Sequence, residues 1–141
     1  MTPAFLQTVL RQFCFALMAV AGQSAALAAD DDIQPFANPW RFVYRDGEHL
    51  YRAICQGCHM ADGKGAQGAG AYPALASNPR LASGLYPASV VLNGRNGMPP
   101  IGRYLDDAQV AAVVNYVRSH FGNDYRDPVS AEDVKNLGPR R

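Results

Sequence analysis

The clearest hydrophobic pattern of the chain lies near its C-terminal end, over residues 107–121. Apolar residues recur there at three- and four-residue steps and form one helical stripe: Val110, Val113, Val114, Val117 and Phe121. Asp106 is placed to cap the first turn, Gln109 occupies the reciprocal capping-box position, and Gly122 follows as a stop signal. The pattern predicts an amphipathic helix from Asp107 to about Phe121.

A second periodic segment begins at Asp46, with small or apolar residues at Gly47, Leu50, Tyr51 and Ile54. It predicts a helix that runs up to residue 55. The alanines at 111–112 leave room for another helix beside the C-terminal stripe, and Gly47 is equally small. We therefore expect the two helices to cross, with Tyr51 near Tyr116.

Three weaker signals predict shorter helices. Asn78 is followed by Pro79 in a first-turn position, and Pro87 begins a segment that ends at Asn93 before Gly94. Residues 130–137 carry a further signal, with an acidic residue three positions after a serine. The sequence leaves open whether this last segment is a cap, a docking element or a tail.

The glycine-rich segment from Asp62 to Gly70 raises the question of a phosphate-binding loop. It does not fit that motif, because Lys64 is followed by glycine instead of Ser or Thr and because no strand precedes it. We expect a flexible loop here instead.

Residues 1–29 have the features of a secretory signal peptide: Arg11, the apolar run Phe13–Ala21, and small residues that permit cleavage after Ala28 or Ala29. As a helix, the nine apolar residues would extend about 14 Å, much less than a hydrocarbon core of about 30 Å. The sequence therefore predicts an exported, periplasmic protein without a membrane span in the mature chain.

The rest of the 141-residue chain is enough for one domain. We expect a linker over residues 30–45, a domain over 46–123 and a C-terminal extension over 124–141. Thirteen Lys and Arg residues nearly balance twelve Asp and Glu residues, and the basic residues are scattered. This distribution argues against nucleic acid as a partner.

The candidate chemistry is concentrated in five residues, Cys55 to His59, which form a Cys-x-x-Cys-His motif. This motif attaches a haem covalently. On a helical turn, Cys55 and Cys58 share one face, so both sulfurs can reach one porphyrin edge while His59 reaches the iron. Cys14 lies in the predicted signal peptide, so the mature chain has no other thiol.

Two alternatives to haem attachment find little support in the sequence. A zinc site needs four ligands, and the mature chain offers only His49 and His120 beyond the motif. A thioredoxin-type redox pair should follow a strand, whereas the residues before Cys55 have a helical pattern.

Met98 is a candidate second ligand. Pro99 and Pro100 follow it and restrict the backbone, which suits a weakly binding thioether.

Three features together resemble class I cytochromes c over residues 46–123: the haem motif at the end of a first helix, a Met-Pro-Pro segment 39 residues after His59, and the final helix. The resemblance implies a small all-α fold in which three to five helices enclose one covalently bound haem c. It further implies His59 and Met98 as iron ligands. Pro73 is similar to the proline whose carbonyl accepts a hydrogen bond from the proximal histidine.

Met98 has two rivals as distal ligand, His49 and His120, but one lies on the helix that carries His59 and the other late on the final helix. A thioether raises the reduction potential relative to a second imidazole. Side chains that could hold the haem propionates are Arg80, Arg95, Arg103, Trp40, Tyr72, Tyr86 and Tyr104.

A haem iron with two protein ligands has no open position for a substrate. The resemblance therefore implies a one-electron carrier or electron-transfer subunit without a catalytic residue. Its expected partners are redox proteins: a periplasmic dehydrogenase as donor, and an oxidase or another cytochrome as acceptor. The alternatives are a haem enzyme or gas sensor with an open distal site, and a docking module whose haem is structural.

Overall fold

The first helical segment of the structure leads directly into the haem motif. The computed structural model describes residues 36–38, 41–68 and 70–138, so the predicted signal peptide lies outside the described residues. Helix α2 (Gly47–Leu50), the π-helical turn η1 (Tyr51–Cys55) and helix α3 (Gln56–His59) follow one another without a break. Asp46 caps α2 through a hydrogen bond from the His49 amide at 2.9 Å. The predicted helix start at Asp46 is confirmed.

Helix α5 (Asp107–Ser119) is the longest described helix, and both predicted capping-box bonds between Asp106 and Gln109 are present. Its buried face is the predicted valine stripe. The helix ends at Ser119, two residues earlier than expected, because Phe121 already has a left-handed backbone with φ 58°.

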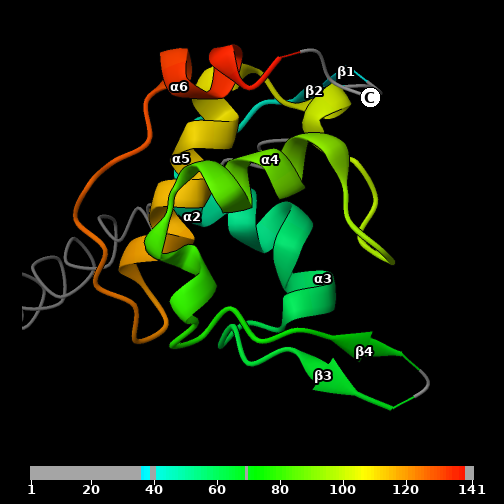
Figure 1. The fold of residues 1–141 in the computed structure, drawn as a ribbon. Coiled ribbons are helices and arrows are strands. Elements are labelled where there is room, and N and C mark those ends of the chain that lie inside the picture. Colours follow the sequence, from blue (N-terminus) through cyan, green and yellow to red (C-terminus); the bar gives the residue numbers. More distant parts are fainter. Residues whose placement is uncertain (1–35, 39–40, 69, 139–141) are drawn as a thin grey trace, which may run out of the picture. The chain divides into compact units, whose positions relative to one another are not determined.

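Helices α2 and α5 pack closely in the core (Figure 1). A Cβ atom at Gly47 would lie 2.3 Å from the Ala112 carbonyl oxygen, so only glycine allows this approach. The rings of Tyr51 and Tyr116 lie 5.7 Å apart. The predicted helix crossing is confirmed. The core contains these buried residues: Leu50, Tyr51, Ala88, Leu92, Leu105, Val110, Ala111, Val113, Val114, Val117, Val129 and Val134.

Helix α4 (Leu85–Asn93) lies between two short 3₁₀ helices, η2 (Pro79–Ala82) and η3 (Gly102–Tyr104). Both helices expected in this region are present. The start expected at Pro87 is wrong by two residues, since Leu85 begins the helix and Pro87 is its third residue. Its end is as expected, with Gly94 at φ 72°.

Two antiparallel hairpins modify the all-α expectation, although the described residues are mostly helical. Strand β1 (Phe36–Asn38) pairs with β2 (Arg41–Phe42), and β3 (Ala66–Gln67) pairs with β4 (Ala71–Tyr72). The second hairpin lies in the glycine-rich segment that we expected to be irregular. A hydrogen bond from the Gly68 amide to the Gly70 carbonyl at 3.0 Å joins the two sides of this hairpin beyond the paired strand residues.

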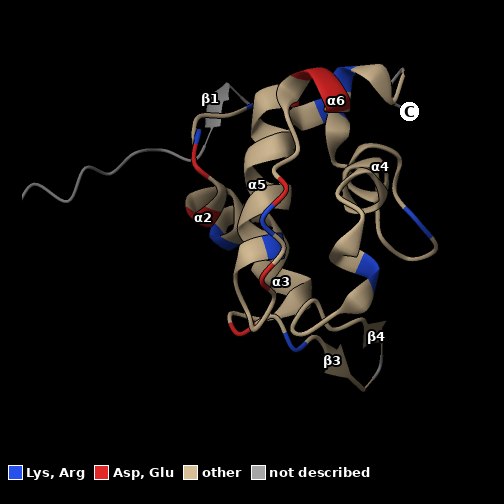
Figure 2. Ribbon diagram, turned by 60° about the vertical axis from the view of Figure 1, so that its left-hand side comes forward, with Lys and Arg blue, Asp and Glu red and all other residues tan. Residues whose placement is uncertain are grey.

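The residues after Asn123 pack on the domain. Helix α6 (Ala131–Asn136) has its own capping box between Ser130 and Asp133 and lies against α5 and α4 (Figure 2). Val134 is buried, and the Asn115 amide binds both the N–H and the C=O of Val129 at 2.8 Å. Of the three roles that the sequence left open for this segment, the structure favours a cap on the core. Among the described helices, none has the length and apolar character needed to cross a bilayer.

Candidate functional site

The haem motif lies at the junction of the π-helical turn and α3. Cys55 is the last residue of η1, whereas Cys58 and His59 belong to α3. Cys58 is exposed and Cys55 is partly buried. Burial, followed by the charge of Cys58, raises the pKa of the Cys55 thiol to about 12. The two sulfurs are three residues apart on one helical turn, the spacing that thioether attachment to a porphyrin edge needs.

His59 is held in one orientation by a backbone carbonyl. The side chain is only 9 % exposed, and its Nδ1 lies 2.9 Å from the Pro73 carbonyl oxygen. A carbonyl oxygen can only accept, so Nδ1 carries the proton, and in the neutral ring Nε2 keeps its lone pair. No described residue forms a hydrogen bond with Nε2. That nitrogen is therefore available to bind a metal.

The peptide after His59 has an unusual backbone that Tyr51 supports. Met60 has φ 64°, a left-handed conformation, and its carbonyl accepts a hydrogen bond of 2.7 Å from the Tyr51 hydroxyl. Burial raises the pKa of Tyr51 to about 12, so the hydroxyl remains a donor at neutral pH. The helical pattern assigned Tyr51 to packing alone, and no sequence signal indicated its contact with residue 60.

Met98 lies in the loop after α4. It forms a reciprocal backbone pair with Arg95, with both N–H···O distances 2.9 Å, and its side chain is partly buried. A Cβ atom at Gly94 would lie 2.6 Å from the Met98 carbonyl oxygen, so glycine is needed where the loop folds back. No hydrogen bond among the described residues joins this loop to His59 or Pro73.

The two rival histidines are exposed and have other partners. His49 pairs with Asp46 at 2.8 Å and stacks on Tyr44. His120 stacks on Tyr116, with its Nδ1 2.9 Å from the Tyr116 carbonyl oxygen.

The propionate candidates divide into several environments. Arg95 lies over the Tyr86 ring at 5.6 Å, and Arg103 lies over the Tyr104 ring at 5.8 Å. Tyr72 is 43 % exposed and Arg80 is exposed, whereas Trp40 lies outside the described residues.

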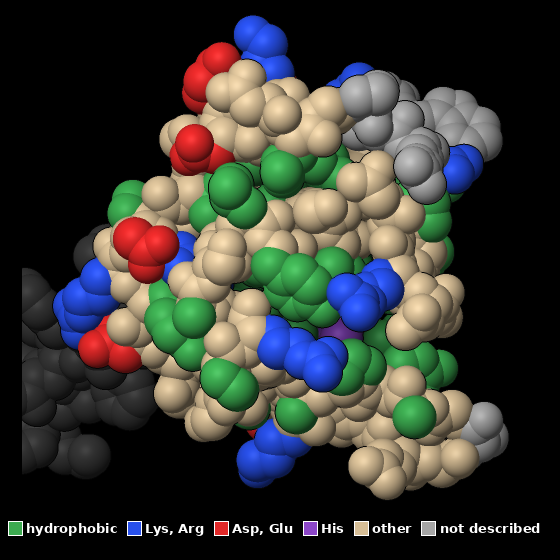
Figure 3. Space-filling model, viewed as in Figure 1, with side chains coloured by type: hydrophobic (Ala, Val, Ile, Leu, Met, Phe, Trp, Pro, Cys, Tyr) green, Lys and Arg blue, Asp and Glu red, His purple; other side chains and the backbone are tan. Residues whose placement is uncertain are grey.

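The candidate residues together supply the donor groups that a haem site requires. Figure 3 shows a histidine among hydrophobic side chains near α3 and α4, with Lys or Arg side chains beside it. Two thiols on one helical turn, an imidazole nitrogen with a free lone pair and a thioether in a restrained loop form a donor set known from c-type haem proteins. The residues therefore fit this cofactor.

Comparison with protein families gives a direct match. The family model described as "Cytochrome C oxidase, cbb3-type, subunit III" matches residues 43–117, just over half of the chain. The chain belongs to this cytochrome c family. The resemblance drawn from the haem motif, the Met-Pro-Pro segment and the final helix is confirmed at the level of the family.

Similar curated proteins are cytochrome subunits of dehydrogenases. The chain is 37 % identical over 107 residues to the fructose dehydrogenase cytochrome subunit of Gluconobacter japonicus, covering 65 % of this chain and 22 % of that protein. It is 31 % identical over 104 residues to the cytochrome c subunit of a quinone-type alcohol dehydrogenase from Gluconobacter oxydans, covering 64 % and 21 % of the two chains. The gluconate 2-dehydrogenase cytochrome c subunit of Pantoea cypripedii is 33 % identical over 105 residues, which cover 64 % and 23 %. The aligned part thus spans about a fifth of the length of these relatives.

Proposed function

We propose that the chain is an exported one-electron carrier, or an electron-transfer subunit, with one covalently attached haem c. Cys55 and Cys58 form the thioethers, and His59 and Met98 are the iron ligands. The observation that carries this proposal is the 2.9 Å contact between His59 Nδ1 and the Pro73 carbonyl. It fixes the ring tautomer that presents Nε2, and the same contact makes the imidazole a stronger donor to a metal.

The protein's own contribution is to hold the ligands with little rearrangement. When bound, the haem supplies a ferric–ferrous couple that takes up and releases one electron. Helix α3 and Pro73 fix His59, while the backbone pair of Arg95 and Met98 restrains the thioether. With an imidazole and a neutral thioether as its ligands, the iron would favour its reduced form more than with two imidazoles, which would raise the reduction potential.

Met98 is the favoured second ligand because the rival histidines are occupied elsewhere. His49 pairs with Asp46, and His120 stacks on Tyr116. Both are exposed on the surface formed by α2 and the end of α5. Met98 instead lies partly buried in a loop stiffened by two prolines.

The partners are inferred from the relatives, which are cytochrome subunits of fructose, alcohol and gluconate dehydrogenases. We infer that this chain accepts electrons from a dehydrogenase that oxidises a sugar, a sugar acid or an alcohol. An oxidase or another cytochrome then accepts them. The chain itself carries no catalytic residue in this proposal, and the predicted signal peptide would place it in the periplasm.

The optical spectrum and an equilibrium redox titration of the purified holoprotein test the proposal. We expect a low-spin spectrum, the weak far-red band of methionine-ligated ferric haem, and a reversible one-electron titration. Mixing with a reduced dehydrogenase of this type should reduce the protein rapidly. A high-spin ferric spectrum with ready peroxide binding would contradict the carrier and support the open-site haem enzyme instead.

A further inference from the structure

Three successive carbonyl groups beside the haem motif are each held by a side chain. The Pro73 carbonyl lies 2.9 Å from His59 Nδ1, and the Ala74 carbonyl accepts from Asn78 Nδ2 at 2.7 Å. The Leu75 carbonyl accepts from Asn123 Nδ2 at 2.9 Å. The carbonyl that orients His59 therefore begins a short backbone segment whose next two carbonyls are fixed by asparagines.

Asn123 is the buried member of this arrangement. Its side chain is 8 % exposed, and it uses both amide protons and its oxygen. Besides Leu75, Nδ2 donates to the Val117 carbonyl at 2.8 Å, and Oδ1 accepts from the Asn78 amide at 2.9 Å. One side chain thus joins the last turns of α5 to both ends of the segment between Leu75 and Asn78.

The position of the Pro73 carbonyl depends on this junction. Proline has no N–H group with which its own peptide could be anchored. On its N-terminal side Tyr72 is paired with Ala66 in the β3–β4 hairpin. On its C-terminal side the anchored groups are the Ala74 carbonyl on Asn78, the Leu75 and Ala76 amides, which donate to the Gly63 carbonyl at 2.7 and 2.9 Å, and the Leu75 carbonyl on Asn123. Without Asn123, the partly buried Leu75 carbonyl and Asn78 amide would both lose their partners, which favours a shift of the segment.

We propose that Asn123 is a positioning residue for the proximal histidine: it fixes the Pro73–Leu75 backbone, and through it the orientation and donor strength of His59. This inference rests on the proposed function, because its readout is the bound haem. A weaker hydrogen bond from the Nδ1 proton to the Pro73 carbonyl makes the imidazole a poorer electron donor, which favours ferrous iron. Loss of the Asn123 amide should therefore raise the reduction potential.

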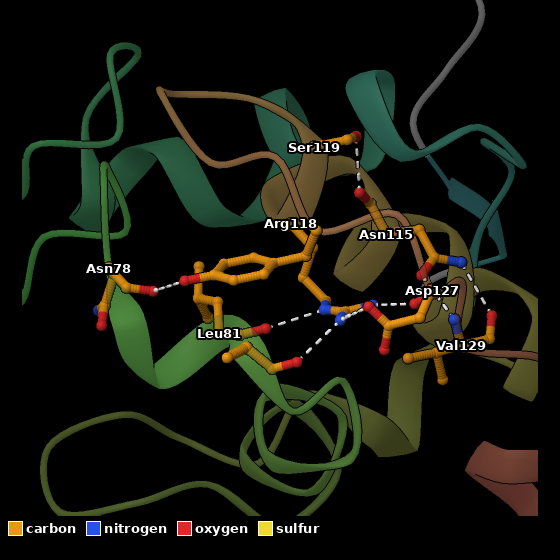
Figure 4. Close-up of polar contacts among 9 residues, drawn as sticks. Asn78, Leu81, Asn115, Arg118, Ser119, Asp127 and Val129 are labelled. Carbon is orange, nitrogen blue, oxygen red and sulfur yellow. Dashed lines mark hydrogen bonds and ion pairs between the residues drawn. The ribbon is translucent and has the colours of Figure 1, made fainter.

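Asn115 provides a matched control. Asn115 lies on α5 and, like Asn123, binds backbone N–H and C=O groups, here those of Val129 at 2.8 Å (Figure 4). Its contacts tie the C-terminal segment to α5 and do not involve residues 73–78. Asn115→Ala therefore removes a comparable bridge without touching the segment beside His59.

The experiment compares the holoproteins of Asn123→Ala, Asn115→Ala and the unmodified chain. Reduction potentials come from equilibrium titration, the His59 Nδ1 proton from proton–nitrogen NMR of the reduced protein, and stability from denaturant unfolding. We expect both variants to lose stability. Only Asn123→Ala should raise the potential and move the Nδ1 proton resonance upfield.

Equal shifts in the two variants, or an unchanged potential and resonance in Asn123→Ala, would overturn the positioning role. If Asn123→Ala does not fold, Asn123→Ser takes its place, since the single hydroxyl proton of the shorter serine cannot donate to the Leu75 and Val117 carbonyls at once. The same upward shift then supports the proposal, and an unchanged potential overturns it. The spectrum of the unmodified protein decides separately whether the proposed His–Met ligation itself is correct.

Discussion

The two candidate iron ligands lie in regions that are held in place by different means. Around His59, side chains bind the backbone: His59 itself, Tyr51, Asn78 and Asn123 all contact main-chain carbonyls. Between Gly94 and Leu105, no side-chain hydrogen bond is present among the described residues, and backbone pairs and prolines restrain the loop. The proximal region is thus held by side-chain hydrogen bonds, whereas the distal region is held by backbone pairs, including the Ile101 amide on the Val91 carbonyl at 3.0 Å, and by the packing of Leu105.

This difference indicates how much each region can rearrange when one of its contacts is removed. A side-chain network with buried members resists rearrangement, because every lost partner leaves an unsatisfied polar group. The backbone pair of Arg95 and Met98, at the exposed end of the distal loop, involves no buried side-chain polar group and can open locally. We therefore expect substitutions near Met98 to release the distal ligand while His59 keeps its position.

The largest expected effect comes from the proximal ligand. His59→Ala should abolish the low-spin haem spectrum, because no other described imidazole in this region can take its place. His120→Ala, at an exposed histidine stacked on Tyr116, is the control and should leave the spectrum unchanged. A normal low-spin spectrum in His59→Ala would contradict the assignment of this ligand.

Removal of the distal ligand should free one coordination position of the iron without unfolding the protein. In Met98→Ala, carbon monoxide affinity should rise by about tenfold or more, since the gas no longer has to displace a bound thioether. Optical titration of the reduced protein measures this change. Met60→Ala, at the methionine next to His59, serves as the control, and an equal response in the two variants would exclude Met98 as the ligand.

A smaller effect is expected from Gly94→Ala. The new Cβ atom would lie 2.6 Å from the Met98 carbonyl oxygen at a residue with φ 72°. The left-handed backbone alone costs about 1–2 kcal/mol for a residue other than glycine. We expect partial loss of the far-red band in the ferric spectrum together with a lower free energy of unfolding, by about 1–2 kcal/mol or more. Gly97→Ala, where a Cβ atom meets nothing within 4 Å, should keep the band.

The smallest effect concerns a polar contact far from both ligands. Arg118 is buried, and besides the Leu81 and Ala82 carbonyls it binds the exposed Asp127 carboxylate at 2.7 Å (Figure 4). The hydrogen bond from Arg118 lowers the pKa of Asp127 below its ordinary value. Because the folded-state pKa is the lower one, the stabilisation is complete above the unfolded-state value of about 3.9 and is lost as the pH falls below it.

Asp127→Asn should therefore lower the free energy of unfolding slightly at neutral pH, and the difference from the unmodified protein should vanish in acid. Denaturant unfolding at several pH values measures this dependence. Asp124→Asn, whose carboxylate pairs with the exposed Arg126, is the control. A difference between Asp127→Asn and the unmodified protein that persists unchanged in acid would contradict the predicted linkage.

Local patterns in the sequence predicted the elements that depend on neighbouring residues. The capping boxes at Asp106 and Ser130 and the close approach at Gly47 were found where the pattern placed them. The early end of α5 and the start of α4 at Leu85 were not, because helix ends also depend on how the following chain packs. The β3–β4 hairpin in the glycine-rich segment was missed because its two-residue strands are too short to show an alternating hydrophobic pattern.

By itself, the sequence determined the cytochrome c family and the five residues that mark the haem site, because covalent attachment requires a fixed spacing along the chain. The resemblance already pointed to the Pro73 carbonyl as the acceptor for His59, whereas only the tertiary structure decided which side chains hold the backbone around that contact. Asn123 reaches Leu75 and Tyr51 reaches Met60 through contacts with main-chain carbonyls, which every residue possesses. The sequence of the accepting segment therefore does not indicate such a contact. The contact can be identified only when the fold brings the two segments together.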